Sequence, residues 1–137
     1  MFTPCQSRSE VAHRLCQLGI SPTHQRVEIA FALFSRHEHL CAEQIMALVN
    51  EHESATSKAT VYNTLNLLVE KRMIREVIVD GTKAFYDPNV EPHFHMYDVT
   101  TGRLSDIDAT DINITGLPVL PDGYHQEGVD LLVRVRS

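Results

Sequence analysis

Apolar residues recur at helical spacing through four consecutive segments in the first half of the chain. These segments span residues 7–18, 23–35, 42–52 and 57–71. Within each segment the apolar side chains fall on one helical face. Ser7, Thr23 and Ser57 stand at the start of three of the segments, where a hydroxyl can cap the first turn. The pattern predicts four amphipathic helices.

Two short β-rich runs follow the fourth segment. They cover residues 74–79 and 83–86 and flank Asp80-Gly81. An Asp-Gly step between such runs is a strong hairpin signal, because Gly81 can take a positive φ. Helices followed by a hairpin are in the order of a winged helix, and the helix before the hairpin is then the candidate recognition helix.

The remaining chain has a strand-like sequence pattern, as expected for a small sheet. Strands are expected at residues 94–99, 103–107 and 129–135, with a turn at 100–102. Gly116, Pro118 and Pro121 disfavour a long helix between the last two strands. Such a sheet has too little apolar surface to be stable alone, so a second copy is the obvious partner.

These elements define the expected fold class and domains. We expect an α+β protein with an N-terminal winged-helix DNA-binding domain in residues 1–86. A small α/β dimerisation and metal-sensing domain then occupies residues 87–137.

Composition fits a folded protein with two unlike halves. The chain has 137 residues, 43% of them hydrophobic, and a formal net charge of -6. Residues 1–86 carry nine Lys/Arg and nine Asp/Glu, whereas residues 87–137 carry three and nine. DNA affinity must therefore depend on locally placed basic residues and not on the global charge.

No apolar run approaches the length of a membrane span, so we expect a soluble cytoplasmic protein without a membrane partner. Cys5, Cys16 and Cys41 include no CxxC pair, which favours reduced thiols over a disulfide framework or a zinc knuckle.

The start of the candidate recognition helix is polar and amphipathic. Lys58 and the backbone N–H groups could contact phosphate, Tyr62 could pack on thymine methyls, and Asn63 could bond a base edge. An ordinary solvated surface helix fits the periodicity about equally well. The hairpin that follows favours the DNA interpretation.

Three stretches resemble one protein family. Leu18–Arg26, Ala59–Leu65 and His93–His95 look like the ferric uptake regulator family of bacterial metal-responsive repressors. The most specific marks are Gly19, Thr23, Gln25 and Arg26, and the Ala-Thr-Val-Tyr run within Ala59–Leu65.

The resemblance implies a transcriptional repressor that regulates iron homeostasis or the response to peroxide stress, and not an enzyme. It implies a homodimer on an AT-rich palindromic operator in double-stranded DNA, with a divalent metal between the domains. In this family the positions matching Arg26, Tyr62 and the first turns of the fourth helix face DNA. The DNA-binding residues we expect are Arg26, Ser57, Lys58, Thr60, Tyr62 and Asn63.

A metal site can also be argued from the residues themselves. His93 and His95 alternate in a strand, so both imidazoles point to one face. Asp87 ends the hairpin, Asp106 lies on the next strand, and His39 lies in the loop before the third helix. Three imidazoles and two carboxylates suit Fe²⁺, Mn²⁺ or, in vitro, Zn²⁺ better than Ca²⁺, Mg²⁺ or Cu⁺.

The family pattern places its regulatory ligands at the same five positions. They are His39, Asp87, His93, His95 and Asp106. Many members hold an auxiliary metal at positions matching Pro92 and Phe94, which cannot ligate. The structural zinc with four Cys is not expected, because Asp98 and Thr101 stand where the first CxxC pair would fall. Glu91 is interpreted as a solvated neighbour.

The zinc-free pattern resembles two branches of the family, peroxide-responsive repressors and haem-sensing iron response regulators. Asp106 favours the peroxide branch, in which a ligating imidazole is oxidised at an Fe²⁺ site. Haem remains an alternative cofactor, although Pro4 precedes Cys5 and no Cys-Pro motif occurs. A small non-haem metalloenzyme with a facial triad is a remote alternative, because it gives the Ala59–Leu65 helix no purpose.

Overall fold

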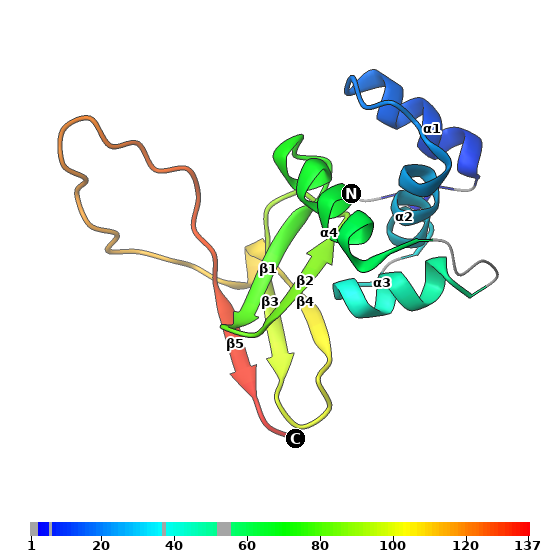
Figure 1. Ribbon diagram of the computed structural model, residues 1–137. Helices are drawn as coiled ribbons and strands as arrows, with labels where there is room; N and C mark the ends of the chain where they lie inside the picture. The colour runs from blue at the N-terminus through cyan, green and yellow to red at the C-terminus, as the bar shows by residue number, and fades with distance from the viewer. Residues whose placement is uncertain (1–2, 6, 37, 52–55) are drawn as a thin grey trace. The chain divides into compact units, whose positions relative to one another are not determined.

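The computed structural model describes residues 3–5, 7–36, 38–51 and 56–137. The chain divides into two compact units, Met1–Glu91 and Pro92–Ser137. The first unit holds four helices and a two-stranded sheet, and the second holds a three-stranded sheet (Figure 1). The expected α+β class is confirmed. The expected domain limit after residue 86 stays a prediction.

The helices begin where the capping residues predict. Their bounds are α1 Arg8–Gln17, α2 His24–Phe34, α3 Ala42–Val49 and α4 Lys58–Glu70. The hydroxyls of Ser7, Thr23 and Ser57 each accept a hydrogen bond from a backbone N–H in the first turn, which satisfies donors that the helix itself leaves open. Helix α3 ends at Val49, before the expected limit at residue 52, which lies outside the described residues.

One apolar core unites the first unit. Helix α2 packs against α1, α3 and α4, and the side chains between them include the fully buried Leu15, Leu33, Ile45 and Leu65. The members of this core lie between Cys5 and Tyr86. Burial of the predicted apolar faces thus fixes α4, whose polar first turn remains at the surface.

The hairpin consists of β1 Arg75–Asp80 and β2 Lys83–Asp87, paired antiparallel with a bulge between Ile78 and Asp80. The expected positive φ at Gly81 is wrong, because the glycines with positive φ are elsewhere in the chain. Instead, Asp80 Oδ1 accepts bonds from the Thr82 backbone N at 2.8 Å and hydroxyl at 2.7 Å. The aspartate side chain therefore shapes the turn in place of glycine.

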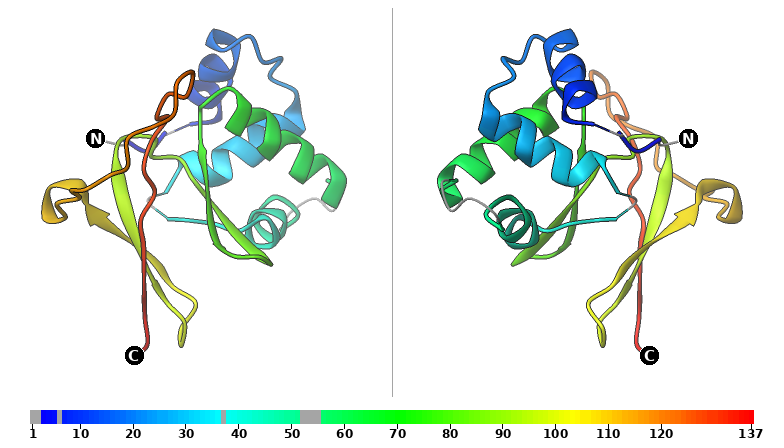
Figure 2. Two further views of the ribbon diagram at one scale, coloured as in Figure 1. Left: turned by 90° about the vertical axis from the view of Figure 1, so that its left-hand side faces the viewer. Right: turned by 90° about the vertical axis from the view of Figure 1, so that its right-hand side faces the viewer.

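The second unit is a sheet in the order β4-β3-β5. Its strands are β3 His93–Asp98, β4 Leu104–Asp108 and β5 Leu132–Val135. Strand β3 is central, antiparallel to β4 and parallel to β5, which Figure 2 shows in red. A short 3-10 helix η1, Ala109–Asp111, and an irregular segment connect β4 to β5, so the expected absence of a long helix between them is confirmed.

Strand β5 begins at Leu132, later than the expected residue 129. Within the described residues, no helix combines the length and apolar character needed to cross a membrane.

Candidate metal and DNA-binding residues

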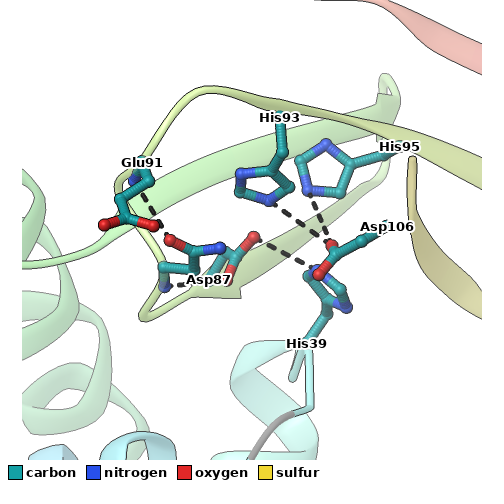
Figure 3. Close-up of polar contacts among 7 residues, drawn as sticks. His39, Asp87, Glu91, His93, His95 and Asp106 are labelled. Carbon is teal, nitrogen blue, oxygen red and sulfur yellow. Dashed lines mark hydrogen bonds and ion pairs between the residues drawn. The ribbon is translucent and has the colours of Figure 1, made fainter. Parts of the chain in front are cut away.

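A short backbone bridge positions the first pair of candidate metal ligands. Leu40 and Tyr86 exchange hydrogen bonds, N to O at 3.2 Å and O to N at 2.7 Å. In an antiparallel bridge the preceding residue of one segment lies beside the following residue of the other. His39 Nε2 accordingly lies 3.1 Å from Asp87 Oδ2. A dashed line marks this contact in Figure 3.

The Asp87 carboxylate is buried, with 3% of the residue exposed. Its Oδ1 accepts a 2.9 Å hydrogen bond from the backbone N of Asn89, which leaves Oδ2 directed at His39. A buried carboxylate requires hydrogen bonds or a positive partner to offset its lost hydration. This pair therefore offers one oxygen and one nitrogen ligand in a position fixed by the backbone.

The second group of candidate ligands lies on the sheet of the second unit. Alternation places His93 and His95 on one face of β3, with ring centroids 4.5 Å apart. The register pairs His95 with Asp106 of β4, and Asp106 Oδ1 lies 3.4 Å from His93 Nε2 and 3.7 Å from His95 Nε2 (Figure 3). Both histidines are buried.

This group suits a divalent cation by its chemistry. One ligand atom from each of His93, His95 and Asp106 lies within 4.8 Å of the other two. Neutral imidazole nitrogens and a carboxylate oxygen form the mixed donor set that Fe²⁺, Mn²⁺ and Zn²⁺ accept. Phe94 occupies the alternate position on β3, so its side chain points to the opposite face, and Glu91 is exposed.

The predicted DNA-binding residues cluster at the start of α4. Ser57 Oγ lies 3.0 Å from Thr60 Oγ1 and accepts a 3.2 Å bond from the Thr60 backbone N, so both hydroxyls serve the cap. Lys58 is exposed, and its Nζ lies 5.9 Å from the centre of the Tyr62 ring. Asn63 is also exposed.

Arg26 shares a surface hollow with α4. The hollow has a volume of about 320 Å³, and its lining includes Arg26, Thr60 and Asn63. Arg26 Nη1 donates a 3.1 Å bond to the Ser21 carbonyl, which holds the guanidinium near the start of α2. Gln25 lines the same hollow and was not anticipated as a site residue, although the motif around Arg26 contains it.

Tyr62 has a partner that the sequence did not indicate. Its hydroxyl donates a 3.2 Å hydrogen bond to Glu43 Oε1 on α3. Desolvation, followed by the charge of Glu43 and this hydrogen bond, raises the pKa of Tyr62 above its usual value. The phenol is therefore neutral at pH 7.

Comparison with known proteins identifies the family. The model of the ferric uptake regulator family matches residues 17–131. A peroxide-responsive repressor, PerR, of Staphylococcus aureus strain Mu50 is 28% identical over 99 residues, covering 72% of this chain and 67% of the relative.

Solved structures share the fold. The ferric uptake regulator from Pseudomonas aeruginosa with manganese matches with a TM-score of 0.70 and 22% identity, over 93% of this chain and 97% of the other. The Campylobacter jejuni peroxide stress regulator matches with a TM-score of 0.62 and 20% identity, over 97% of each chain. The chain belongs to the ferric uptake regulator family, and the resemblance inferred from the three stretches is confirmed.

Proposed function

We propose that this chain is a metal-dependent transcriptional repressor that binds double-stranded DNA as a homodimer in the cytoplasm. The observation that carries the proposal is the pairing of a winged-helix unit with a sheet that presents His93, His95 and Asp106 together. Membership of a family of regulators supports the DNA partner over an enzymatic role.

The DNA-binding half of the proposal rests on α4 and the residues around it. Helix α4 precedes the hairpin, and its exposed first turns carry Lys58 and Asn63. A recognition helix uses such residues for phosphate and base-edge contacts, respectively. Arg26, beside Thr60 and Asn63 in one hollow, supplies a further cation at the same surface.

The metal half of the proposal joins the two ligand groups into one site. Asp87 and His93 are six residues apart in the chain, so their Cα atoms can be separated by at most about 20 Å. The regulatory ligand positions of the family correspond to His39 and Asp87 in addition to the three candidate ligands on the sheet. One ion held by residues from both units would favour one arrangement of the units, and so couple metal binding to DNA binding.

The donor set favours Fe²⁺ or Mn²⁺ as the resident ion, with Zn²⁺ able to bind in vitro. When bound, the ion would supply a positive charge that all five ligands share. The protein's own contribution is orientation. The Leu40–Tyr86 bridge holds one pair of ligands, and the register of β3 with β4 holds the other three.

Peroxide is the signal we favour, with haem as the alternative. Relatives named as peroxide regulators support it. With Fe²⁺ loaded, hydrogen peroxide is then expected to add one oxygen atom to a ligating imidazole. Anaerobic Fe²⁺ loading, H₂O₂ treatment and peptide mass spectrometry test this at His39 and His93. A haem titration that yields a stoichiometric complex, without any oxygen adduct after peroxide, would favour the haem-sensing alternative instead.

Dimerisation is proposed for the second unit. Strand β3 and its neighbours expose Met96 and Val133, which are 37% and 39% exposed and are paired across β3 and β5. A second copy would cover such side chains. Sedimentation at increasing concentration measures the state directly, and a protein that stays monomeric with Mn²⁺ present would contradict the proposal.

The central experiment is DNA binding with and without Mn²⁺. Wild-type protein is expected to select a palindromic duplex from randomised DNA only when metal is present. Arg26→Ala is expected to weaken binding by about ten- to a hundredfold. His13→Ala, on the exposed face of α1, is the matched control and should bind normally. Failure of wild-type protein to select any duplex under every metal condition would overturn the function.

The metal assignment has its own test. The double variant His93→Ala, His95→Ala should lose Mn²⁺ binding while its far-UV circular dichroism remains like that of wild type. His125→Ala, exposed in the irregular segment before β5, is the control and should retain full metal stoichiometry. Unchanged metal binding by the double variant would rule out these ligands.

A further inference from the structure

Helix α3 carries an acidic side chain that reaches the candidate recognition helix. Glu43 Oε1 accepts the hydrogen bond of the Tyr62 hydroxyl, and the two residues are 19 positions apart in the chain. Both line a surface hollow of about 400 Å³ that is also lined by residues of the hairpin. The bond therefore connects α3 to α4, the candidate recognition helix, beside the hairpin.

Glu43 is exposed, its pKa is lowered, and its backbone lies in a capped helical turn. It lies in the first turn of α3, whose start is secured by the Cys41 backbone N bonded to Gln44 Oε1 at 2.9 Å. A hydrogen bond with its own backbone N–H, and then the bond from Tyr62, lower the pKa of Glu43. An ionised carboxylate can only accept hydrogen bonds.

The consequence concerns the polarity of Tyr62. A phenol has one proton to donate and oxygen lone pairs to accept with. Because Glu43 takes that proton, the Tyr62 oxygen offers only acceptor capacity to any further partner. In the major groove, adenine N6 and cytosine N4 are donors, whereas thymine O4 and guanine O6 are acceptors.

We propose that Glu43 is a positioning residue for base recognition, which orients the Tyr62 ring and makes its hydroxyl an acceptor for the exocyclic amine of adenine or cytosine. The inference rests on the proposed DNA-binding function and deepens it. Thymine O4 and guanine O6 at the same position are rejected, because two acceptors would face each other without a proton.

Glu43 also has an opposing electrostatic effect on DNA. A carboxylate near the duplex repels phosphate, so its removal raises affinity for every sequence. Orientation of Tyr62 affects only the ratio of specific to non-specific binding. A double-mutant cycle separates the two, because repulsion is removed equally whether residue 62 is Tyr or Phe.

The experiment uses the full-length protein with Mn²⁺ and a duplex that the wild type selects from randomised DNA. Affinities for this duplex and for a scrambled duplex are measured for wild type, Glu43→Ala, Tyr62→Phe and the double variant. In the protein that retains Tyr62, Glu43→Ala is expected to lower the ratio of specific to non-specific affinity about tenfold. It should leave the ratio unchanged in the Phe variant.

Two matched variants separate positioning from charge. Glu43→Gln keeps a carbonyl acceptor and should restore most of the specificity ratio that Glu43→Ala loses. Glu76→Ala removes a carboxylate from the same hollow and should leave the ratio unchanged. Equal losses of the specificity ratio from Glu76→Ala and Glu43→Ala would overturn the proposal, because the bond to the Tyr62 hydroxyl would then not be the cause.

Base analogues supply a readout that folding defects do not mimic. Purine, which lacks the 6-amino group of adenine, replaces each adenine of the selected duplex in turn. 2-Pyrimidinone, which lacks the 4-amino group of cytosine, replaces each cytosine. At one position the replacement should lower the DNA affinity of the wild-type protein but not that of Tyr62→Phe. If each replacement changes the affinity of the two proteins equally, or if the double-mutant cycle is additive, Glu43 has no such role. The proposed DNA-binding function would not be contradicted by that result. If wild type selects no duplex, both proposals fall.

Discussion

The two units of the chain differ in how their interiors are filled. The first unit has a continuous apolar core whose members run from Cys5 to Tyr86. In the second unit, all of whose residues the structure describes, only Tyr97 and Leu104 are buried apolar residues. The buried face of β3 carries His93 and His95 instead, which are groups that require polar partners.

This difference assigns the source of stability in each unit. Hydrophobic burial suffices for the first unit, which needs no ligand to hold α4 in place. A three-stranded sheet with two buried apolar side chains is marginal in isolation. We therefore expect the second unit to be stabilised by what binds it, because anything that binds only the folded form adds stability that rises with the logarithm of its concentration.

The largest expected effect contrasts the two units directly. In dilute, metal-free protein, the amides of β3 and β5 should exchange with solvent about a thousandfold faster than those buried in α4, because the first unit has its own core and the second does not. Mn²⁺ and higher protein concentration should slow exchange in β3 selectively. Hydrogen exchange with mass spectrometry measures both. Equal protection of the two units under dilute conditions would contradict the comparison.

Core substitutions sharpen the same contrast. Leu65→Ala removes a side chain that is 0% exposed in the first unit and should destabilise that unit by about 2–5 kcal/mol. Val133→Ala removes one that is 39% exposed in the second unit, and should cost less than about 1 kcal/mol in the monomer. Urea unfolding followed by circular dichroism gives both values. A similar cost for Val133→Ala at low concentration would indicate a hidden core in the second unit.

Alkaline pH should weaken the first unit through Tyr86. Burial, and then the charge of Glu76, raise the pKa of Tyr86 from 10.0 to about 12. Well below pH 10 the phenol is neutral in both the native and the unfolded chain, so its contribution to stability is complete. Between pH 10 and 12 the unfolded chain ionises first, and the unfolding free energy should fall by about 2–3 kcal/mol. Tyr86→Phe should flatten this part of the stability profile, with Tyr124→Phe, whose side chain is exposed, as the control.

Local signals in the sequence predicted the helices well, because the caps at Ser7, Thr23 and Ser57 lie beside the groups they satisfy. The hairpin was predicted, but its turn was not. Gly81 offered a positive φ, yet Asp80 could bond Thr82 instead, and sequence alone does not rank these alternatives.

The candidate ligands were predicted in part by alternation, which placed His93 and His95 on one face. What alternation could not supply was register. The pairing of His95 with Asp106 depends on which residues of β3 and β4 are opposed, and a slip of one residue would turn Asp106 to the other face. The Leu40–Tyr86 bridge and the Glu43–Tyr62 bond join distant segments, so no local pattern contained them.

The smallest expected effect tests whether the caps matter equally in the first unit. Ser57→Ala removes the bond to the Thr60 backbone N and should cost about 1 kcal/mol of unfolding free energy. Ser7→Ala removes the matching bond to the Glu10 backbone N at the start of α1 and should cost about the same. The two should differ in DNA binding. Ser57 also contacts the Thr60 hydroxyl, so its loss loosens the first turn of α4, where Lys58 lies. If Ser57→Ala weakens DNA binding more than Ser7→Ala does, at equal stability, the first turn of α4 belongs to the DNA interface. Equal weakening would assign both losses to stability alone.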